Sequence, residues 1–119
     1  MTDTFAAEWV AAWNRHDLDA ILAHYADDVV FTSPFAVRLT GDGTVRGKDA
    51  LRAYFAAALT KFPDLHFRLR HALAGVNSLV LLYDSVEGLL AAEAFEFDSG
   101  GKVTRVNCHY TPAAPEGCP

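Results

Sequence analysis

In the first half of the chain, hydrophobic residues recur every three or four positions, which is the spacing of one face of a helix. This pattern predicts a first helix over residues 3–14, with Trp9 and Trp13 on its buried face. The sequence Asn-Arg-His-Asp interrupts the pattern, and Asp17 can act as the N-cap of a second helix. That helix is predicted over residues 18–26, with apolar side chains along its inner face.

Two segments separate this helix from the next one. Residues 29–32 form a short apolar run that predicts a buried strand, and Ser33-Pro34 ends it because proline cannot donate to a sheet ladder. Residues 35–46 contain Gly-Asp-Gly and are predicted to be a loop. A third helix is predicted over residues 49–61, where Phe-Pro-Asp ends it.

In the second half of the chain the hydrophobic period changes to two, the spacing of β-strands. Strands are predicted over residues 65–73, 78–86, 89–97 and 102–110, joined by turns rich in glycine and asparagine. Three helices followed by a run of antiparallel strands predict an α+β fold. In such a fold the helices gather on one face of a bent sheet.

The turn at Glu87-Gly88 is predicted to be a tight hairpin that fixes the pairing of its two strands. In that register Leu82 lies opposite Glu93, on the face that also carries Asp84 and Phe95. The other face is then apolar as well and carries Leu79, Leu81, Tyr83, Ala92 and Ala94. Because the helices can cover only one face, we expect a second copy of the chain to cover the other, giving a homodimer.

The chain has 119 residues and a net charge of −5, which predicts one domain and argues against nucleic acid and anionic membranes as partners. The first residues lack a basic and apolar leader, and no apolar run approaches the ~20 residues that cross a bilayer. We therefore expect a cytoplasmic protein with free thiols at Cys108 and Cys118. Residues 112–119 are predicted to be a loose tail.

The five histidines lie at positions 16, 24, 66, 71 and 109. None of these spacings is that of a zinc site or of two ligands one helical turn apart. The sequence therefore predicts neither a metal ion nor another cofactor.

Several stretches together resemble a known superfamily: "NRHDLDAILAHYADDVVFTSP", "GKDALRAYF" and "FEFDSGGKV" in this order. They resemble the nuclear transport factor 2-like superfamily, and within it the SnoaL-like and ketosteroid isomerase-like members. The resemblance covers about residues 3–111 and implies a cone-shaped domain with a strongly curved, mostly antiparallel sheet. It implies no single activity, since this fold is used by isomerases, cyclases, dehydratases, hydrolases and non-catalytic binders.

The resemblance also relates individual residues to the isomerases' machinery. The catalytic aspartate that precedes the strand-ending proline in the isomerases is Ser33 in this chain. Their oxyanion-binding tyrosine corresponds to Trp9, and a supporting tyrosine corresponds to Phe55. Glu93 matches their second acid. The base and both tyrosines are replaced, which argues against steroid isomerisation by the family's mechanism.

Glu93 is the main candidate for catalysis, because a carboxyl group on an apolar strand face is desolvated and titrates near neutral pH. His71 is a second candidate, since a histidine near Glu93 would let the pair move a proton. Each residue also has a structural interpretation: Glu93 can form a purely structural pair, and His71 can be a hydrogen-bonded core residue.

The remaining candidates are expected to line an apolar pocket inside the cone. They are Trp9, Trp13, Tyr25, Ser33, Tyr54, Phe55, Leu82, Asp84, Phe95, Val106, Cys108 and Tyr110. We expect this pocket to bind a small hydrophobic molecule and to isomerise, cyclise or dehydrate it by proton transfer. The alternative is a non-catalytic dimer of the same fold that binds a ligand or a protein.

Overall fold

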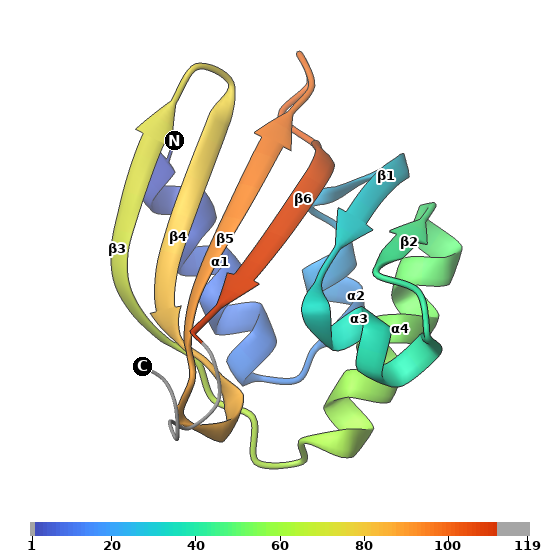
Figure 1. The fold of residues 1–119 in the computed structure, drawn as a ribbon. Coiled ribbons are helices and arrows are strands. Elements are labelled where there is room, and N and C mark those ends of the chain that lie inside the picture. The colour runs from blue at the N-terminus through green and yellow to red at the C-terminus, as the bar shows by residue number, and fades with distance from the viewer. Residues whose placement is uncertain (1, 112–119) are drawn as a thin grey trace.

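The computed structural model describes residues 2–111, and these form a single sheet with four α-helices (Figure 1). In chain order the elements are α1 (Thr2–Asn14), α2 (Leu18–Leu22), β1 (Tyr25–Thr32), α3 (Pro34–Thr40), β2 (Thr44–Arg46), α4 (Lys48–Lys61), β3 (Arg68–Gly75), β4 (Ser78–Asp84), the 3-10 helix η1 (Val86–Gly88), β5 (Leu90–Phe97) and β6 (Val103–Tyr110). The predicted tail and Cys118 lie outside the described residues.

The sheet has six strands in the order β2-β1-β6-β5-β4-β3. All neighbours are antiparallel except β1 and β6, which run parallel. Figure 1 shows α1 behind β4 and β5, and α2 to α4 gathered beside β1 and β2. The α+β fold with a curved, mostly antiparallel sheet is therefore confirmed. None of the described helices combines the length and the hydrophobicity needed to cross a membrane.

The second helix is shorter than predicted and the strand after it is longer. The helix ends at Leu22, and Tyr25 is already the first residue of β1. The chain turns here because β1 pairs with β6, where Tyr25 lies beside Val103 and the carbonyl of His24 accepts a hydrogen bond from the Val103 amide. These long-range contacts override a helical pattern that extended one turn further.

The predicted loop over residues 35–46 contains two elements, α3 and β2. Ser33 is the N-cap of α3, since its Oγ accepts a hydrogen bond from the Phe35 amide at 3.1 Å. Pro34 fits the first helical position, where no amide hydrogen is needed. Gly41 ends the helix in the left-handed region, at φ 84°. The Ser-Pro sequence therefore both ends a strand and begins a helix.

The predicted hairpin register is wrong by one residue. Leu81 lies opposite Glu93, and Tyr83 lies opposite Ala91. The connection between β4 and β5 is one residue longer than the predicted tight turn, because Glu87 adopts a left-handed conformation at φ 59° within η1. An odd shift in pairing exchanges the two faces of one strand while the other strand keeps its own.

This shift reverses the inner and outer faces of β4. Leu79, Leu81 and Tyr83 are buried under the helices rather than on the outer face. Leu82 and Asp84, which were expected inside the cone, belong to the outer face. Asp84 there pairs with Arg68 at 3.1 Å and with Arg70 at 2.9 Å.

His71 is also on the outer face, contrary to its prediction as an inward residue. Strand β3 follows the predicted alternation as far as Leu69, which pairs with Tyr83, but the next pairing joins His71 to Leu82. This β-bulge adds one residue to β3 and exchanges its faces beyond that point. His71 is consequently exposed on the outer face, whereas the side chain of Glu93 points into the cone. The two side chains therefore lie on opposite faces of the sheet.

Candidate functional site

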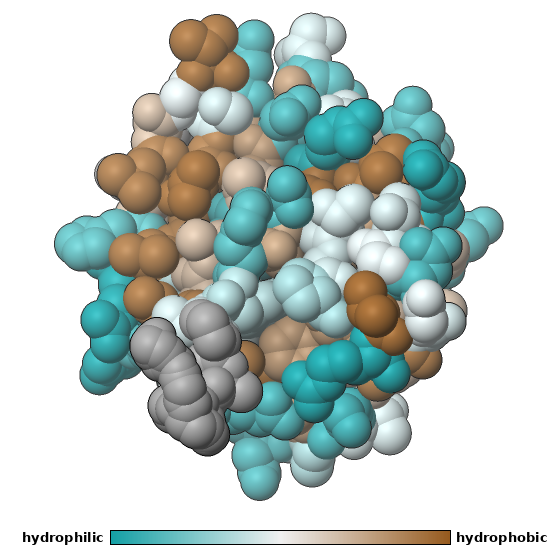
Figure 2. Space-filling model, viewed as in Figure 1, coloured by the Kyte–Doolittle hydropathy of each residue, from teal (hydrophilic) through white to brown (hydrophobic). Residues whose placement is uncertain are grey.

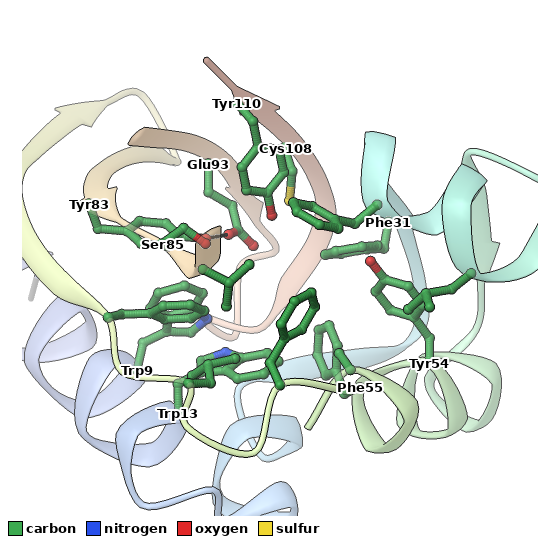
Figure 3. Close-up of a pocket in the computed structure, with 17 residues that line it drawn as sticks. Trp9, Trp13, Phe31, Tyr54, Phe55, Tyr83, Ser85, Glu93, Cys108 and Tyr110 are labelled. Atoms are coloured by element: carbon green, nitrogen blue, oxygen red, sulfur yellow. Dashed lines mark hydrogen bonds between the residues drawn. The ribbon is translucent and has the colours of Figure 1, made fainter. Parts of the chain in front are cut away.

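A small cavity of about 50 Å³ lies inside the cone, between the sheet and the helices (Figure 3). Seven of the predicted site residues line it: Trp9, Trp13, Tyr54, Phe55, Glu93, Cys108 and Tyr110. They come from α1, α4, β5 and β6, so the cavity brings together residues from both halves of the chain. Within residues 2–111, the side chains that line it are buried or half-buried, so the cavity is largely shielded from solvent.

Aromatic rings form the floor and walls of this cavity. Trp9 stacks on Phe67 with ring centroids 5.7 Å apart, and Trp13 meets Phe55 edge to face at 4.8 Å. Phe31 packs edge to face on Phe55 at 5.4 Å. Such contacts hold large rings in fixed orientations, so the walls are rigid and apolar.

The wide end of the cone is covered by α3 and η1. Phe35 and Leu39 of α3 and Val86 of η1 all line the cavity from this side. An ion pair on the outer surface joins the two elements, with Arg38 Nη1 3.3 Å from Glu87 Oε1. The two half-exposed side chains stabilise this closure weakly, because solvent screens such pairs.

Of the side chains that the structure describes, Glu93 is the one charged group that lines the cavity. It is 3% exposed, and the hydroxyl of Tyr83 donates a hydrogen bond of 2.6 Å to its Oε1 (Figure 3). Burial raises the pKa of Glu93 to about 7, although hydrogen bonds from Tyr83 and Cys108 favour the charged form and limit the rise. Near neutral pH the carboxyl group is thus present both as an acid and as a base.

Hydroxyl and thiol groups surround this acid. Burial raises the pKa of Tyr54 and Tyr110, and the negative charge of Glu93 raises both further. Burial likewise raises the pKa of Cys108, beside Glu93. These three groups therefore stay neutral while Glu93 titrates, and they serve as hydrogen-bonding groups rather than nucleophiles.

The two tryptophans of the cavity differ in their hydrogen bonds. Trp9 donates from Nε1 to the hydroxyl of Tyr25 at 3.0 Å. Trp13 Nε1 is buried and has no hydrogen-bond partner among the described residues. Figure 3 shows Trp13 on the side of the pocket opposite Glu93. The cavity thus has an acid on one side and a free N–H donor on the other.

The other predicted site residues lie elsewhere. Four are buried but do not line the cavity: Tyr25, Ser33, Phe95 and Val106. Three lie on the outer face of the sheet: His71, Leu82 and Asp84. The predicted pair of Glu93 with His71 does not form, and Glu93 is hydrogen-bonded to Tyr83 instead.

Several residues of the cavity were not predicted. Tyr83, the hydrogen-bond partner of Glu93, was assigned to the outer face by the wrong register. Phe35 and Leu39 were assigned to a loop, although Ser33-Pro34 before them is a recognisable helix start. Phe67 was not among the predicted site residues, and it forms part of the cavity wall.

Among the described residues, no three histidine, cysteine, aspartate or glutamate side chains come together in the way a metal site requires.

Comparison with known proteins identifies the family. The family model of the SnoaL-like domain matches residues 6–110. The chain belongs to the SnoaL-like family. A SnoaL-like protein of unknown function from Burkholderia thailandensis is 44% identical, with a TM-score of 0.89 over 93% of this chain and 95% of that one. No curated protein matches the chain.

More distant structures share the fold of this SnoaL-like domain. A protein with a cystatin-like fold from Methylobium petroleophilum has a TM-score of 0.77 at 16% identity, over 98% of this chain and 80% of that one. The epoxide hydrolase/cyclase-like enzyme SalBIII, described in pyran ring formation in salinomycin, has a TM-score of 0.75 at 19% identity, over 92% and 90%. At these identities the likeness concerns the fold alone.

Proposed function

We propose that this SnoaL-like protein binds a small hydrophobic molecule in the cavity of the cone and transfers a proton to or from it through Glu93. The observation that carries the proposal is one buried carboxyl group, with a pKa of about 7, facing an otherwise uncharged aromatic cavity. A group whose pKa lies near the working pH is suited to both halves of a proton transfer.

The reaction that fits this site is one in which Glu93 returns to the substrate the proton that it has removed. Glu93 as carboxylate takes a proton from the bound molecule and gives it back at another atom, which isomerises or cyclises the substrate, or leads to loss of water. The Tyr83 hydroxyl, 2.6 Å from Oε1, stabilises the carboxylate before the transfer. The fold is compatible with this class of reaction, since an epoxide hydrolase/cyclase-like enzyme shares it.

The ligand has to enlarge the cavity. At about 50 Å³ the cavity is smaller than the roughly 150 Å³ cavity that holds benzene in a protein core. The covering elements α3 and η1 are the parts that can move, since the ion pair of Arg38 with Glu87 is exposed and weak. The ligand is therefore small, or it binds as these elements open.

The test measures proton transfer without knowledge of the natural substrate. The protein is incubated in heavy water with β,γ-cyclopentenone, and deuterium uptake and conversion to the conjugated isomer are followed by NMR and ultraviolet absorbance. Glu93→Gln is expected to lower both rates by roughly 10²–10⁴-fold, because an amide cannot take up the proton. The exposed Glu96→Gln on the same strand is the matched control and should leave both rates unchanged.

A non-catalytic binding protein is the second candidate, and the position of Ser33 favours it. Serine is uncharged and its hydroxyl caps α3, and within residues 2–111 no second acidic side chain lines the cavity beside Glu93. Binding of the ketone without deuterium uptake in the wild-type protein would select this candidate and reject proton transfer.

We also propose that two copies of the chain pair through the outer face of the sheet. With the observed register, the apolar centre of this face consists of Val80, Leu82, Ala92 and Ala94, beside the 56% exposed Leu73. Figure 2 shows hydrophobic side chains gathered over β3 and β4 on the face that the helices leave uncovered. A second copy would cover this area with the same residues.

Leu82→Glu is expected to give a monomer in sedimentation equilibrium, because it would bury a charge at the centre of the pairing face. Val76→Glu at the tip of the β3–β4 hairpin, where Val76 is 91% exposed, should leave the dimer intact. A wild-type protein that stays monomeric at all concentrations would refute the pairing.

A further inference from the structure

The indole N–H of Trp13 is the least explained polar group of the molecule. The Trp13 side chain is 5% exposed and lines the cavity, and its Nε1 has no partner among the described residues. A buried donor without an acceptor is destabilising, and folded proteins satisfy nearly all such groups. A donor left open towards a cavity is therefore a sign that a bound molecule supplies the acceptor.

The surroundings of Trp13 restrict what that acceptor can be. Among the described residues 2–111, no lysine, arginine or histidine lines the cavity, and Glu93 is the single acid there. An anionic ligand would face Glu93 without a compensating cation, and burial of the unpaired charge would oppose its binding. An ammonium ion has no lone pair for the indole N–H. A neutral oxygen, as in a ketone, ester or ether, carries no charge and offers a lone pair to the indole N–H.

We infer that Trp13 is a specificity-determining residue, whose indole N–H binds a neutral acceptor oxygen of the ligand while the rest of that ligand lies against the aromatic walls. This inference rests on the proposed function, since it assumes that a small molecule enters the cavity. It adds that the molecule is an uncharged oxygen compound and that its oxygen faces α1. In Figure 3 this side lies opposite Glu93, so the ligand lies between the donor and the acid.

The chain offers a direct measurement, because it contains two tryptophans. A ¹H–¹⁵N spectrum therefore shows two indole signals, and Trp9→Phe and Trp13→Phe assign them. The Trp9 indole already donates to Tyr25, whereas the Trp13 indole is free to form a new bond. Titration with cyclopentanone is expected to move the Trp13 signal downfield and to move the Trp9 signal much less. Methylenecyclopentane has the same shape but no oxygen, and should produce no downfield shift.

Affinities give a second, independent measurement. The ratio of the two dissociation constants, ketone against hydrocarbon, is compared between the wild type and Trp13→Phe. Loss of the donor is expected to shift this ratio against the ketone by roughly 2- to 10-fold, the effect of one neutral hydrogen bond.

The outcomes separate the inference from the proposed function. If both probes bind, move the methyl signals of Leu39 and Val86, and leave the Trp13 indole signal in place, the cavity binds small molecules but the inference is wrong. If neither probe changes any signal of the cavity, the proposed function fails and the inference fails with it. Trp9→Phe alone assigns both indole signals, so the titration of the wild-type protein decides between these outcomes even if Trp13→Phe does not fold.

Discussion

Raising the pH from below 4.5 to above 7 is expected to lower the free energy of unfolding by about 3 kcal/mol through Glu93 alone. The folded protein holds the Glu93 proton up to a pKa of about 7, whereas in the unfolded chain the group has its usual value of 4.5. The contribution is therefore complete below pH 4.5 and is lost progressively as the pH rises to the folded pKa. Urea unfolding at a series of pH values measures it.

Glu93→Gln should keep the fold and remove this part of the pH dependence. Wild type and variant share every other titrating group, so the quantity to compare is the difference between their free energies of unfolding across the pH range. Glu96→Gln is the control, because Glu96 lies exposed on the same strand. A difference between wild type and Glu93→Gln that stays constant across this range would show that Glu93 is not desolvated.

Trp9→Ala is expected to destabilise the protein by about 3–5 kcal/mol, as large-to-small substitutions of buried aromatic residues do. Trp9 is 1% exposed, and its ring contacts those of Tyr83 and Phe95 with centroids 5.3 and 5.5 Å apart. The substitution also removes the donor that bonds to the buried hydroxyl of Tyr25. Urea unfolding at constant pH gives the change in the free energy of unfolding.

Val37→Ala is the comparison for this experiment, since Val37 is 52% exposed on α3, and its effect should stay within about 0.5 kcal/mol. Trp9→Phe keeps an aromatic ring but removes the hydrogen-bond donor. Its effect on the free energy of unfolding is expected to lie between those of Trp9→Ala and Val37→Ala. A loss of less than about 1 kcal/mol for Trp9→Ala would mean that the aromatic cluster can close around the gap.

The sequence predicts well where one face of an element is clearly apolar and the other clearly polar. Helix α1 was predicted to within a residue because its aromatic side chains share one face. On β5 the alternation of Ala91, Glu93 and Phe95 correctly placed the acid inside the cone. In both cases the burial of large side chains on one side decides the orientation.

The pattern could not predict the faces of β4, because residues 79–83 are all apolar and both faces look alike. The orientation is decided by the hairpin connection, where Glu87 adopts a left-handed conformation that its residue type does not suggest. The β-bulge before His71 is likewise set by local backbone geometry, which the pattern of apolar and polar residues does not predict. The errors at Tyr83, Asp84 and His71 therefore come from two small changes of register rather than from a wrong fold.

The capping role of Ser33 bears on which side chains this position can carry. Aspartate is as good an N-cap as serine, so Ser33→Asp would preserve the start of α3 while adding a carboxyl group at the position where isomerases of the superfamily carry their base. Because either side chain can accept the hydrogen bond from the Phe35 amide, the start of the covering helix does not by itself restrict position 33 to serine.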